Sequence, residues 1–279
     1  MEKVEPILID LTDYEYAGEG ANGSSYNHKS DPGVMLKLYN PGKEGHALNE
    51  LIVAKKVFGI GIPSPEPGDL VTDGKRHGIR FRRISGKKSF SRAVGDNPER
   101  VEEYAREFAQ MCRKLHSIHV DTSLFENVKD RYYRLLDENP FFTPEQKEKI
   151  ADFIRQAPDS DIALHGDLQF SNAIFVGDER YFIDLGDFCY GYPMFDIGMV
   201  YLCCNLSGED FIYETFHMRK DVSRAFWKAF APAYFGPDAD LEAIEKEVRI
   251  YAGLKTLIVE RDTRCPMPEF RAMLEGTIY

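Results

Sequence analysis

The run His165-Gly166-Asp167-Leu168-Gln169-Phe170-Ser171-Asn172 places an amide five residues after a carboxylate, and Asp184 follows twelve residues after Asn172. Phosphoryl transfer needs a carboxylate that aligns the attacking hydroxyl and accepts its proton, together with oxygen ligands for Mg²⁺. Asp167 can do the first, while Asn172 and Asp184 can bind the metal from two sides. Isolated acids in loops usually cap turns, but this spacing is too specific for that explanation. The pattern therefore predicts a phosphoryl-transfer site.

Lys37 is a lone cation within the apolar segment 34–39. A lysine on a strand can reach nucleotide phosphates, and a carboxylate on the following helix can orient it. Glu50 is the favoured carboxylate for this task, and Glu44 is a less favoured one. The alternative is that Lys37 lies on the solvent face of an edge strand and binds nothing.

Gly18, Gly20 and Gly23 form a G-x-G-x-x-G pattern. In a dinucleotide-binding fold this pattern should follow a strand and open a helix. Here the pattern leads instead through residues 24–28 and a turn to the strand around Lys37. A glycine loop between two strands is the kinase arrangement, in which backbone N–H groups cover the nucleotide phosphates. A flexible glycine hairpin that binds no ligand is the alternative.

The elements that must position these residues begin with a strand-rich first third. Apolar and β-branched residues predict strands at 6–11, 14–17 and 34–39 and a hairpin at 70–72 and 79–84. Between them, residues 44–58 have apolar side chains at helical spacing.

The remainder of the chain reads mostly as helices. Asn97 and Pro98 predict a helix start, and Thr143 with Gln146 predicts a capping box. An embedded hairpin is expected at 173–176 and 180–183, and further helices at 193–206, 208–219, 221–235, 240–260 and 268–276. This order predicts an α+β fold with an N-terminal domain of residues 1–86 and a C-terminal domain of residues 87–279.

Composition excludes several classes of function. The net charge of −11 argues against nucleic acid as a partner, because phosphate contacts need clustered Lys and Arg, and it is compatible with a cationic substrate. Five cysteines form no pair with zinc-ligand spacing, which suits a reducing compartment. The longest apolar run, residues 199–204, is too short to span a bilayer, and the N-terminus lacks a signal-peptide core. We therefore expect a cytoplasmic protein without a membrane partner, while its oligomeric state stays open.

The chain resembles the aminoglycoside phosphotransferase and choline kinase-like family, which shares the two-lobed protein-kinase-like fold. The motifs HGDLQFSN at 165–172 and IDLGD at 183–187 carry the resemblance, which extends from the glycine loop to the terminal helices. It implies an enzyme that moves the γ-phosphate of ATP or GTP to a hydroxyl of a small-molecule acceptor with Mg²⁺. Residues 169–171 depart from the His-Pro-Gly run of many relatives, which affects the substrate more than the reaction.

The same resemblance implies roles for individual residues. Asp167 is similar to the catalytic aspartate, Asn172 and Asp184 to the Mg²⁺ ligands, and Lys37 to the phosphate-contacting lysine. The remaining residues implied in the site are Glu50 as the partner of Lys37, His165 as a brace of the catalytic loop, Asp196 as an anchor of that loop through hydrogen bonds, and Ile84-Ser85-Gly86 as the adenine-binding hinge.

Other functions fit the sequence less well. A protein kinase would carry a long activation segment ending in A-P-E, whereas only eleven residues separate Asp184 from Asp196. A non-catalytic nucleotide-binding protein on the same fold is the main alternative, and the intact set of catalytic groups argues against it. His116 and His119, three residues apart, could be a metal pair, but without a third ligand they are interpreted as helix-end residues. Glu209 and Asp210 could bind an amino group or serve as first-turn acids of a helix capped by Ser207.

Overall fold

The computed structural model describes residues 4–20, 22–275 and 277–278, which form two compact units. The first unit comprises the chain up to Lys88 together with Ala173–Asp187, and the second comprises Ser89–Asn172 with Phe188–Tyr279. The segment Ala173–Asp187 belongs with the first unit, whereas a single boundary at residue 86 would assign it to the second. Its apolar side chains explain this, because Ile174 and Ile183 line a pocket with residues of the first unit.

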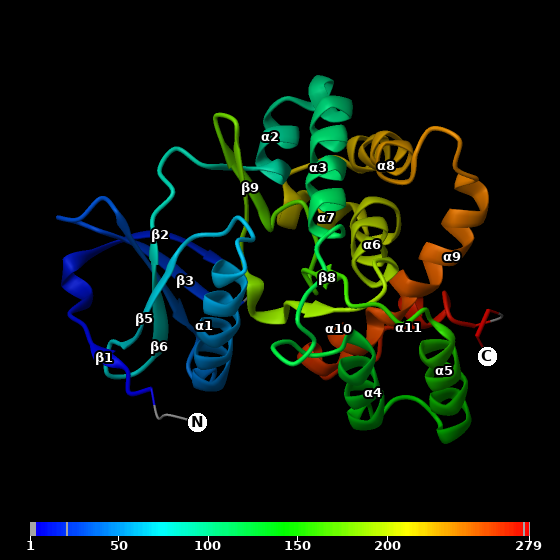
Figure 1. Cartoon of the computed structure of the whole chain (residues 1–279), viewed down its shortest axis with the longest axis horizontal. Helices are drawn as coiled ribbons and strands as arrows, with labels where there is room; N and C mark the ends of the chain where they lie inside the picture. The colour runs from blue at the N-terminus through cyan, green and yellow to red at the C-terminus, as the bar shows by residue number, and fades with distance from the viewer. Residues whose placement is uncertain (1–3, 21, 276, 279) are drawn as a thin grey trace. The chain divides into compact units, whose positions relative to one another are not determined.

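The first unit contains a six-stranded sheet in the order β1-β5-β6-β4-β3-β2, antiparallel except that β1 runs parallel to β5 (Figure 1). Its strands are β1 (Ile7–Leu8), β2 (Tyr14–Gly20), β3 (Gly23–His28), β4 (Val34–Tyr39), β5 (Pro67–Thr72) and β6 (His77–Arg82). The expected strand at 6–11 is only partly present, because Asp10 accepts a hydrogen bond from the backbone of Thr12 and starts a 3₁₀ turn at Leu11–Asp13.

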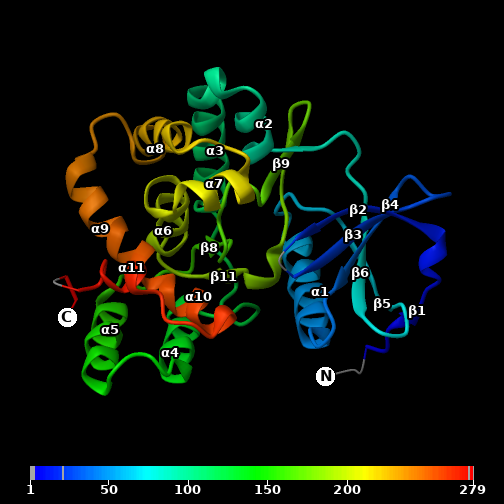
Figure 2. The ribbon, with the colours of Figure 1, turned by 180° about the vertical axis from the view of Figure 1, so that it is seen from behind.

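Both faces of the sheet are covered in the middle. Helix α1 (Glu44–Gly59) packs on one face against β4, β5 and β6, as both views of the chain show (Figures 1 and 2). The buried side chains on that face include Tyr39, Leu51 and Ile79, while Leu36 and Leu38 face a second cluster on the other side. Strand β4 therefore alternates between two cores, which explains why its sequence is almost wholly apolar.

A β-hairpin completes the first unit. Strands β9 (Ala173–Val176) and β10 (Glu179–Phe182) pair across Gly177, which has the left-handed φ of 53° that a tight turn requires. The hairpin predicted from the sequence is present within one residue of its expected limits. After β10 the chain turns into a 3₁₀ segment, Leu185–Asp187, which packs against α1. The short strand β7 (Lys88–Ser89) lies where the first unit ends.

The second unit is helical (Figure 2). Helix α3 packs against α8, and α6 packs against α9. Its helices are α2 (Phe90–Asp96), α3 (Val101–Leu115), α4 (Val128–Glu138), α5 (Pro144–Gln156), α6 (Met194–Tyr201), α7 (Glu209–Phe216), α8 (Lys220–Phe235), α9 (Leu241–Leu254), α10 (Thr256–Thr263) and α11 (Pro268–Arg271), and its strands are β8 (Ala163–Leu164) and β11 (Cys189–Tyr190).

Several local expectations are wrong in detail. Asn97 does not cap the helix that follows it: its side chain donates to the carbonyl of Ala93 and so closes the end of α2, a helix that the sequence did not reveal. The helix expected at 193–206 changes into a π-helical segment at Leu202–Leu206, and the one expected at 240–260 breaks at Lys255. The predicted capping box of Thr143 and Gln146 is present.

The α+β architecture with a β-rich first part and a helical remainder confirms the expected fold class. Within the described residues, no helix has both the length and the apolar character needed to cross a membrane.

Candidate active site

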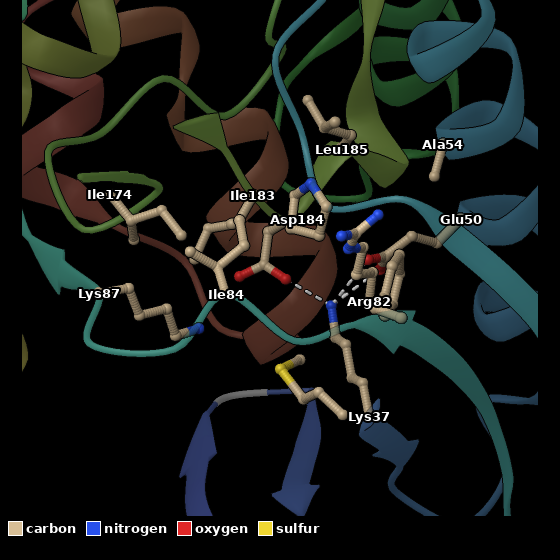
Figure 3. Close-up of a pocket in the computed structure, with 13 residues that line it drawn as sticks. Lys37, Glu50, Ala54, Arg82, Ile84, Lys87, Ile174, Ile183, Asp184 and Leu185 are labelled. Atoms are coloured by element: carbon tan, nitrogen blue, oxygen red, sulfur yellow. Dashed lines mark hydrogen bonds and ion pairs between the residues drawn. The ribbon is translucent and has the colours of Figure 1, made fainter. Parts of the chain in front are cut away.

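Lys37 lies on a central strand, because β4 has β6 on one side and β3 on the other. The edge-strand alternative for this lysine is therefore wrong. Its Nζ donates to both carboxylate oxygens of Glu50, at 3.0 and 2.8 Å, and to Oδ1 of Asp184 at 2.5 Å. Tyr39, two residues further along the same face of β4, also donates its hydroxyl to Glu50. One lysine thus joins the sheet, helix α1 and the end of the hairpin, as the dashed lines in Figure 3 show.

These contacts change the pKa values of Lys37 and Glu50. Burial alone would lower the pKa of Lys37, but the carboxylates of Asp184 and Glu50 outweigh it and hold this pKa well above its ordinary value. Burial and the nearby Asp184 raise the pKa of Glu50, although Lys37 counteracts them. The lysine is therefore a firmly charged cation, whereas burial disfavours the charge of Glu50, and Lys37 and the Tyr39 hydroxyl stabilise that charge. The less favoured Glu44 is exposed and accepts a hydrogen bond from the backbone of Gly42 instead.

Asp184 owes its orientation to the backbone. Its φ of 59° lies in the left-handed region, which Asp tolerates better than most residues and which turns the chain sharply after β10. The next residues are fixed to α1, where the side-chain amide of Asn49 donates to the carbonyl of Gly186 at 3.0 Å. The Asp184 side chain stays 47% exposed, so a ligand can reach it without unfolding anything.

A pocket adjoins this charged cluster within the first unit; its cavity volume is about 60 Å³, and it is partly open to solvent. Its apolar wall consists of Met35, Ala54, Pro65, Phe81, Ile84, Ile174, Ile183 and Leu185, and its charged groups are Lys37, Glu50, Arg82, Lys87 and Asp184 (Figure 3). An apolar wall beside cationic groups suits a flat aromatic base attached to an anionic group. Of the expected hinge residues, Ile84 lines the pocket and Ser85 lies exposed beside it.

The glycine-rich segment forms a hairpin between β2 and β3, with Gly20 opposite Gly23 and position 21 outside the described residues. The predicted strand–loop–strand context is therefore present. Gly23 is required by space, since a Cβ there would stand 2.0 Å from the carbonyl oxygen of Leu38. Gly18 accepts a hydrogen bond from the hydroxyl of Ser25 at 3.1 Å. A contact of Gly18, Gly20 or Gly23 with nucleotide stays a prediction.

The catalytic-loop candidate lies in the second unit and folds back on itself. The Asn172 amide nitrogen donates to Oδ2 of Asp167 at 2.9 Å and to the backbone carbonyl of the same residue at 3.0 Å. Gln169 donates to the same Oδ2 at 3.0 Å. The five-residue spacing between Asp167 and Asn172 thus closes a small ring, and the Asn172 amide oxygen is the atom that a metal would take.

Asp196 anchors this loop from the first turn of α6. Although it is wholly buried, it accepts from the backbone N–H of His165 at 2.7 Å, from that of Gly166 at 2.9 Å and from His116 at 3.2 Å. Burial would raise the pKa of Asp196, but the hydrogen bond and charge of His116, with the fields of His165 and Lys255, outweigh it and lower this pKa. His165 is itself wholly buried, and its ring nitrogen Nδ1 lies 3.4 Å from the backbone nitrogen of Asp167.

Three supporting residues escaped the sequence interpretation. His116 was interpreted only as a helix-end residue, but it stabilises the loop of Asp167, because it contacts Asp196 and also the hydroxyl of Tyr234. Lys255, 1% exposed at the break between α9 and α10, lies in the fields of Asp196 and Asp167. Tyr39 carries the hydroxyl bound to Glu50. No local signal marks the roles of His116 and Lys255, since each depends on a residue far away in sequence. Ser207, proposed as the cap of α7, instead donates to the carbonyl of Leu202, and Gly208 occupies the cap position.

Asp184 in the first unit and Asn172 in the second each carry an oxygen donor of the kind that a magnesium ion takes. Mg²⁺ commonly binds one or two protein oxygens and completes its shell with water and substrate phosphates. Asp184 offers an accessible carboxylate and Asn172 an amide oxygen, which is the donor chemistry that this ion takes. The described residues contain no cluster of three or more His, Cys, Asp or Glu that could hold a metal.

A model of the phosphotransferase enzyme family matches residues 13–239. Because this match covers more than half of the chain, the chain belongs to that family, and the predicted phosphotransferase class is confirmed. The sequence resemblance to the aminoglycoside phosphotransferases is confirmed with it.

Solved structures support the same fold. An aminoglycoside phosphotransferase of Streptomyces rimosus, solved with ADP and streptomycin, is 19% identical with a TM-score of 0.59, over 90% of this chain and 99% of that one. A choline/ethanolamine kinase family protein of Mesorhizobium loti is 18% identical with a TM-score of 0.54, over 94% and 84%. A thermostable mutant of another aminoglycoside phosphotransferase, in its apo form, is 12% identical with a TM-score of 0.61, over 95% and 96%. The kinase-like fold expected from the sequence is thus confirmed.

One curated relative is named for a different activity. The inosose dehydratase of Bacillus licheniformis is 30% identical over 110 residues, which is 38% of this chain. The chain spans 35% of the length of that relative, so the match is too partial to transfer its activity.

Proposed function

We propose that the protein is a kinase that transfers the γ-phosphate of ATP or GTP to a hydroxyl of a small-molecule acceptor with Mg²⁺. The carrying observation is the ion cluster of Lys37, Glu50 and Asp184 in the wall of an apolar pocket. Lys37 is only 18% exposed, and removing its charge from water costs free energy that pairing only partly offsets, so the cluster is an unfavourable arrangement without a ligand. Family membership supplies the reaction class for this arrangement.

In this proposal the first unit binds the nucleotide. The base lies against the apolar wall near Ile84, and the glycine hairpin of residues 18–23 covers the phosphates. Lys37 donates to phosphate oxygens, while Glu50 holds its ammonium in place and keeps it charged. Asn172 and Asp184 would hold Mg²⁺, which neutralises phosphate charge when bound.

Asp167 acts on the acceptor. Its carboxylate accepts a hydrogen bond from the acceptor hydroxyl and takes up its proton as the acceptor oxygen bonds to the γ-phosphorus and the bond to the β-phosphate oxygen breaks. Gln169 and Asn172 fix Oδ2 of this carboxylate, and Asp196 fixes the backbone on which it stands. Because the transition state is loose, positioning supplies most of the rate in this proposal.

A cationic acceptor is the first class to test. The net charge of −11 favours positively charged molecules near the protein surface. One structural relative was solved with streptomycin, a cationic amino sugar, and another belongs to the choline/ethanolamine kinase family. Amino sugars and amino alcohols are therefore the first acceptors to test.

The test is Mg²⁺-dependent turnover of ATP and GTP with a panel of amino sugars, amino alcohols and neutral sugars. Asp167→Asn should lower turnover at least about a hundredfold, since a positioned base contributes about 10²–10⁴. Nucleotide affinity should stay within about twofold. Asp161→Asn is the matched control, because it removes an exposed carboxylate of the same unit that is paired with His119.

Full turnover by Asp167→Asn would overturn the assignment of the base. Tight nucleotide binding without transfer to any acceptor would favour the non-catalytic alternative on the same fold.

A further inference from the structure

Lys87 is the second lysine of the pocket, and neither the family motif nor the proposed reaction gives it a role. It follows the hinge segment directly and lines the pocket with Lys37 and Asp184. In the view of Figure 3, Lys87 and Lys37 enter from different segments and the Asp184 carboxylate lies between their ammonium groups. Both lysines therefore line the pocket near the Asp184 carboxylate, whose charge acts on each of them.

The backbone before Lys87 explains its direction. Gly86 has a φ of 71°, in the left-handed region that favours glycine, and a Cβ at this position would be in ordinary contact with the side chain of Val176, 3.8 Å away. A residue with a Cβ would be strained at this point. The turn at Gly86 thus sends the next side chain back towards the pocket.

The charge of Lys87 is poorly compensated, in contrast to the other cations of the pocket. Lys37 has Glu50 and Asp184, and Arg82 lies 3.8 Å from Glu66. In the part of the chain that the structure describes, Lys87 makes no hydrogen bond or ion pair. Lys87 is exposed, yet desolvation by the surrounding pocket and the nearby Arg83 lower its pKa, and the field of Asp184 only partly offsets this.

An ammonium group without a partner, in a pocket wall beside a carboxylate, fits an anionic ligand. Asp184 is already held by Lys37, so a phosphate entering here would bring two negative groups to a single lysine. A second cation reduces that repulsion and adds a charge-assisted hydrogen bond.

We propose that Lys87 is a second phosphate-binding cation of the nucleotide site, which pairs with an oxygen of the nucleotide phosphates while Lys37 binds the same phosphates. This inference rests on the proposed nucleotide binding and adds a residue to it. Lys87 would then distinguish nucleotides by their phosphates, whereas the apolar wall around Ile84 recognises the base and sugar.

The experiment compares the affinities of nucleoside, monophosphate, diphosphate and triphosphate, in the adenine and the guanine series, by calorimetry in EDTA. Lys87→Gln should weaken diphosphate and triphosphate about tenfold, as expected for one partly buried ion pair, and change the nucleoside less than twofold. Lys87→Arg should restore diphosphate affinity to within about threefold of the wild type. The dependence of affinity on salt should also be shallower in Lys87→Gln.

Lys75→Gln is the matched control, because it changes the net charge equally at an exposed turn between β5 and β6 and outside the pocket. It should leave every affinity unchanged. Equal weakening of nucleoside and diphosphate by Lys87→Gln would indicate a sugar contact and overturn the proposal, as would unchanged diphosphate affinity.

The outcomes also separate this inference from the proposed function. If the wild type binds no nucleotide, both fail. If the wild type binds diphosphate and Lys87→Gln binds it equally well, only the role of Lys87 fails. If Lys87→Gln selectively weakens diphosphate but the wild type phosphorylates no acceptor, the role of Lys87 stands and the kinase proposal fails.

Discussion

Two buried carboxylates, one in each unit, are held in opposite ways. Glu50 depends on side chains: Lys37, which it shares with Asp184, and the hydroxyl of Tyr39. Asp196 depends mainly on the backbone, through the N–H groups of His165 and Gly166, with the ring of His116 in addition. The pKa of Glu50 is raised by burial, while that of Asp196 is lowered because its donors outweigh burial.

The difference teaches which parts of the candidate site are fixed and which can exchange partners. Backbone donors cannot rotate away, so the loop that bears Asp167 is set by the fold itself. A lysine shared by two carboxylates can release Asp184 to another ligand and keep Glu50. In the proposed function, the nucleotide would therefore bind where ion pairs can exchange partners, and the acceptor hydroxyl would be held by a loop that the backbone fixes.

The largest loss of stability is expected from Asp196→Asn. The substitution keeps the shape but replaces one acceptor oxygen with a donor, and because the N–H groups of His165 and Gly166 bind different oxygens, one of these buried donors loses its partner. We expect unfolding free energy to fall by about 3 kcal/mol, in the range for a broken buried network, and turnover to fall at least about tenfold. Urea unfolding and the kinase assay measure the two effects. Asp161→Asn should change stability by less than about 1 kcal/mol, since its ion pair with His119 is exposed. A stability loss no larger than this control would show that Asp196 does not hold the loop.

Glu50→Gln should lower the unfolding free energy less than Asp196→Asn does. It should also separate the effect on stability from the effect on nucleotide affinity or turnover. Because the fold already disfavours the charge of Glu50, we expect a loss of only about 1 kcal/mol. Lys37 would lose one of its two carboxylates, so nucleotide affinity or turnover should fall about tenfold. Glu44→Gln, which removes an exposed carboxylate from the first turn of the same helix, is the control. Equal stability losses for Glu50→Gln and Asp196→Asn would remove the contrast between the two units.

The pH dependence of stability should have opposite signs for the two residues. Asp196 has a lowered pKa, so its stabilisation is complete above its ordinary value of 3.8 and is lost as pH falls through the lower folded value. Glu50 has a raised pKa, so the wild type loses stability relative to Glu50→Gln as pH rises above 4.5. Unfolding free energies of wild type and both variants between pH 3 and 7, about the range of these pKa values, measure the differences. The same sign for both would contradict the assigned causes.

The sequence predicted those parts of the fold that depend on neighbours in the chain. The apolar run of β4, the helical spacing of α1 and the turn at Gly177 are local patterns, and all three elements are present. The pairing of Lys37 with Glu50 followed from placing a strand beside the next helix. The Asp167–Asn172 contact likewise lies within one loop.

Features that depend on distant partners could not be predicted in this way. Asn97 has the composition of a helix start, but a carbonyl of the preceding turn takes its amide. His116 contacts Asp196, eighty residues away, and Lys255 lies where a long helical pattern breaks in two. The role of Lys87 depends on a turn at Gly86 and on a carboxylate that arrives almost a hundred residues later.

The smallest effect on the candidate active site is expected from the capping box of α5. It tests whether the contrast between Glu50 and Asp196 is confined to that site. Thr143 and Gln146 form a capping box at the start of α5, with both reciprocal hydrogen bonds present. Thr143→Ala should lower unfolding free energy by about 1 kcal/mol through loss of the cap, and Thr143→Ser should restore most of it. Turnover and nucleotide affinity should stay unchanged in both, as measured in the same assays. A loss of turnover in Thr143→Ala would mean that stability anywhere in the helical unit reaches the catalytic loop, and the rigidity assigned to the Asp196 network would then be a property of the whole unit.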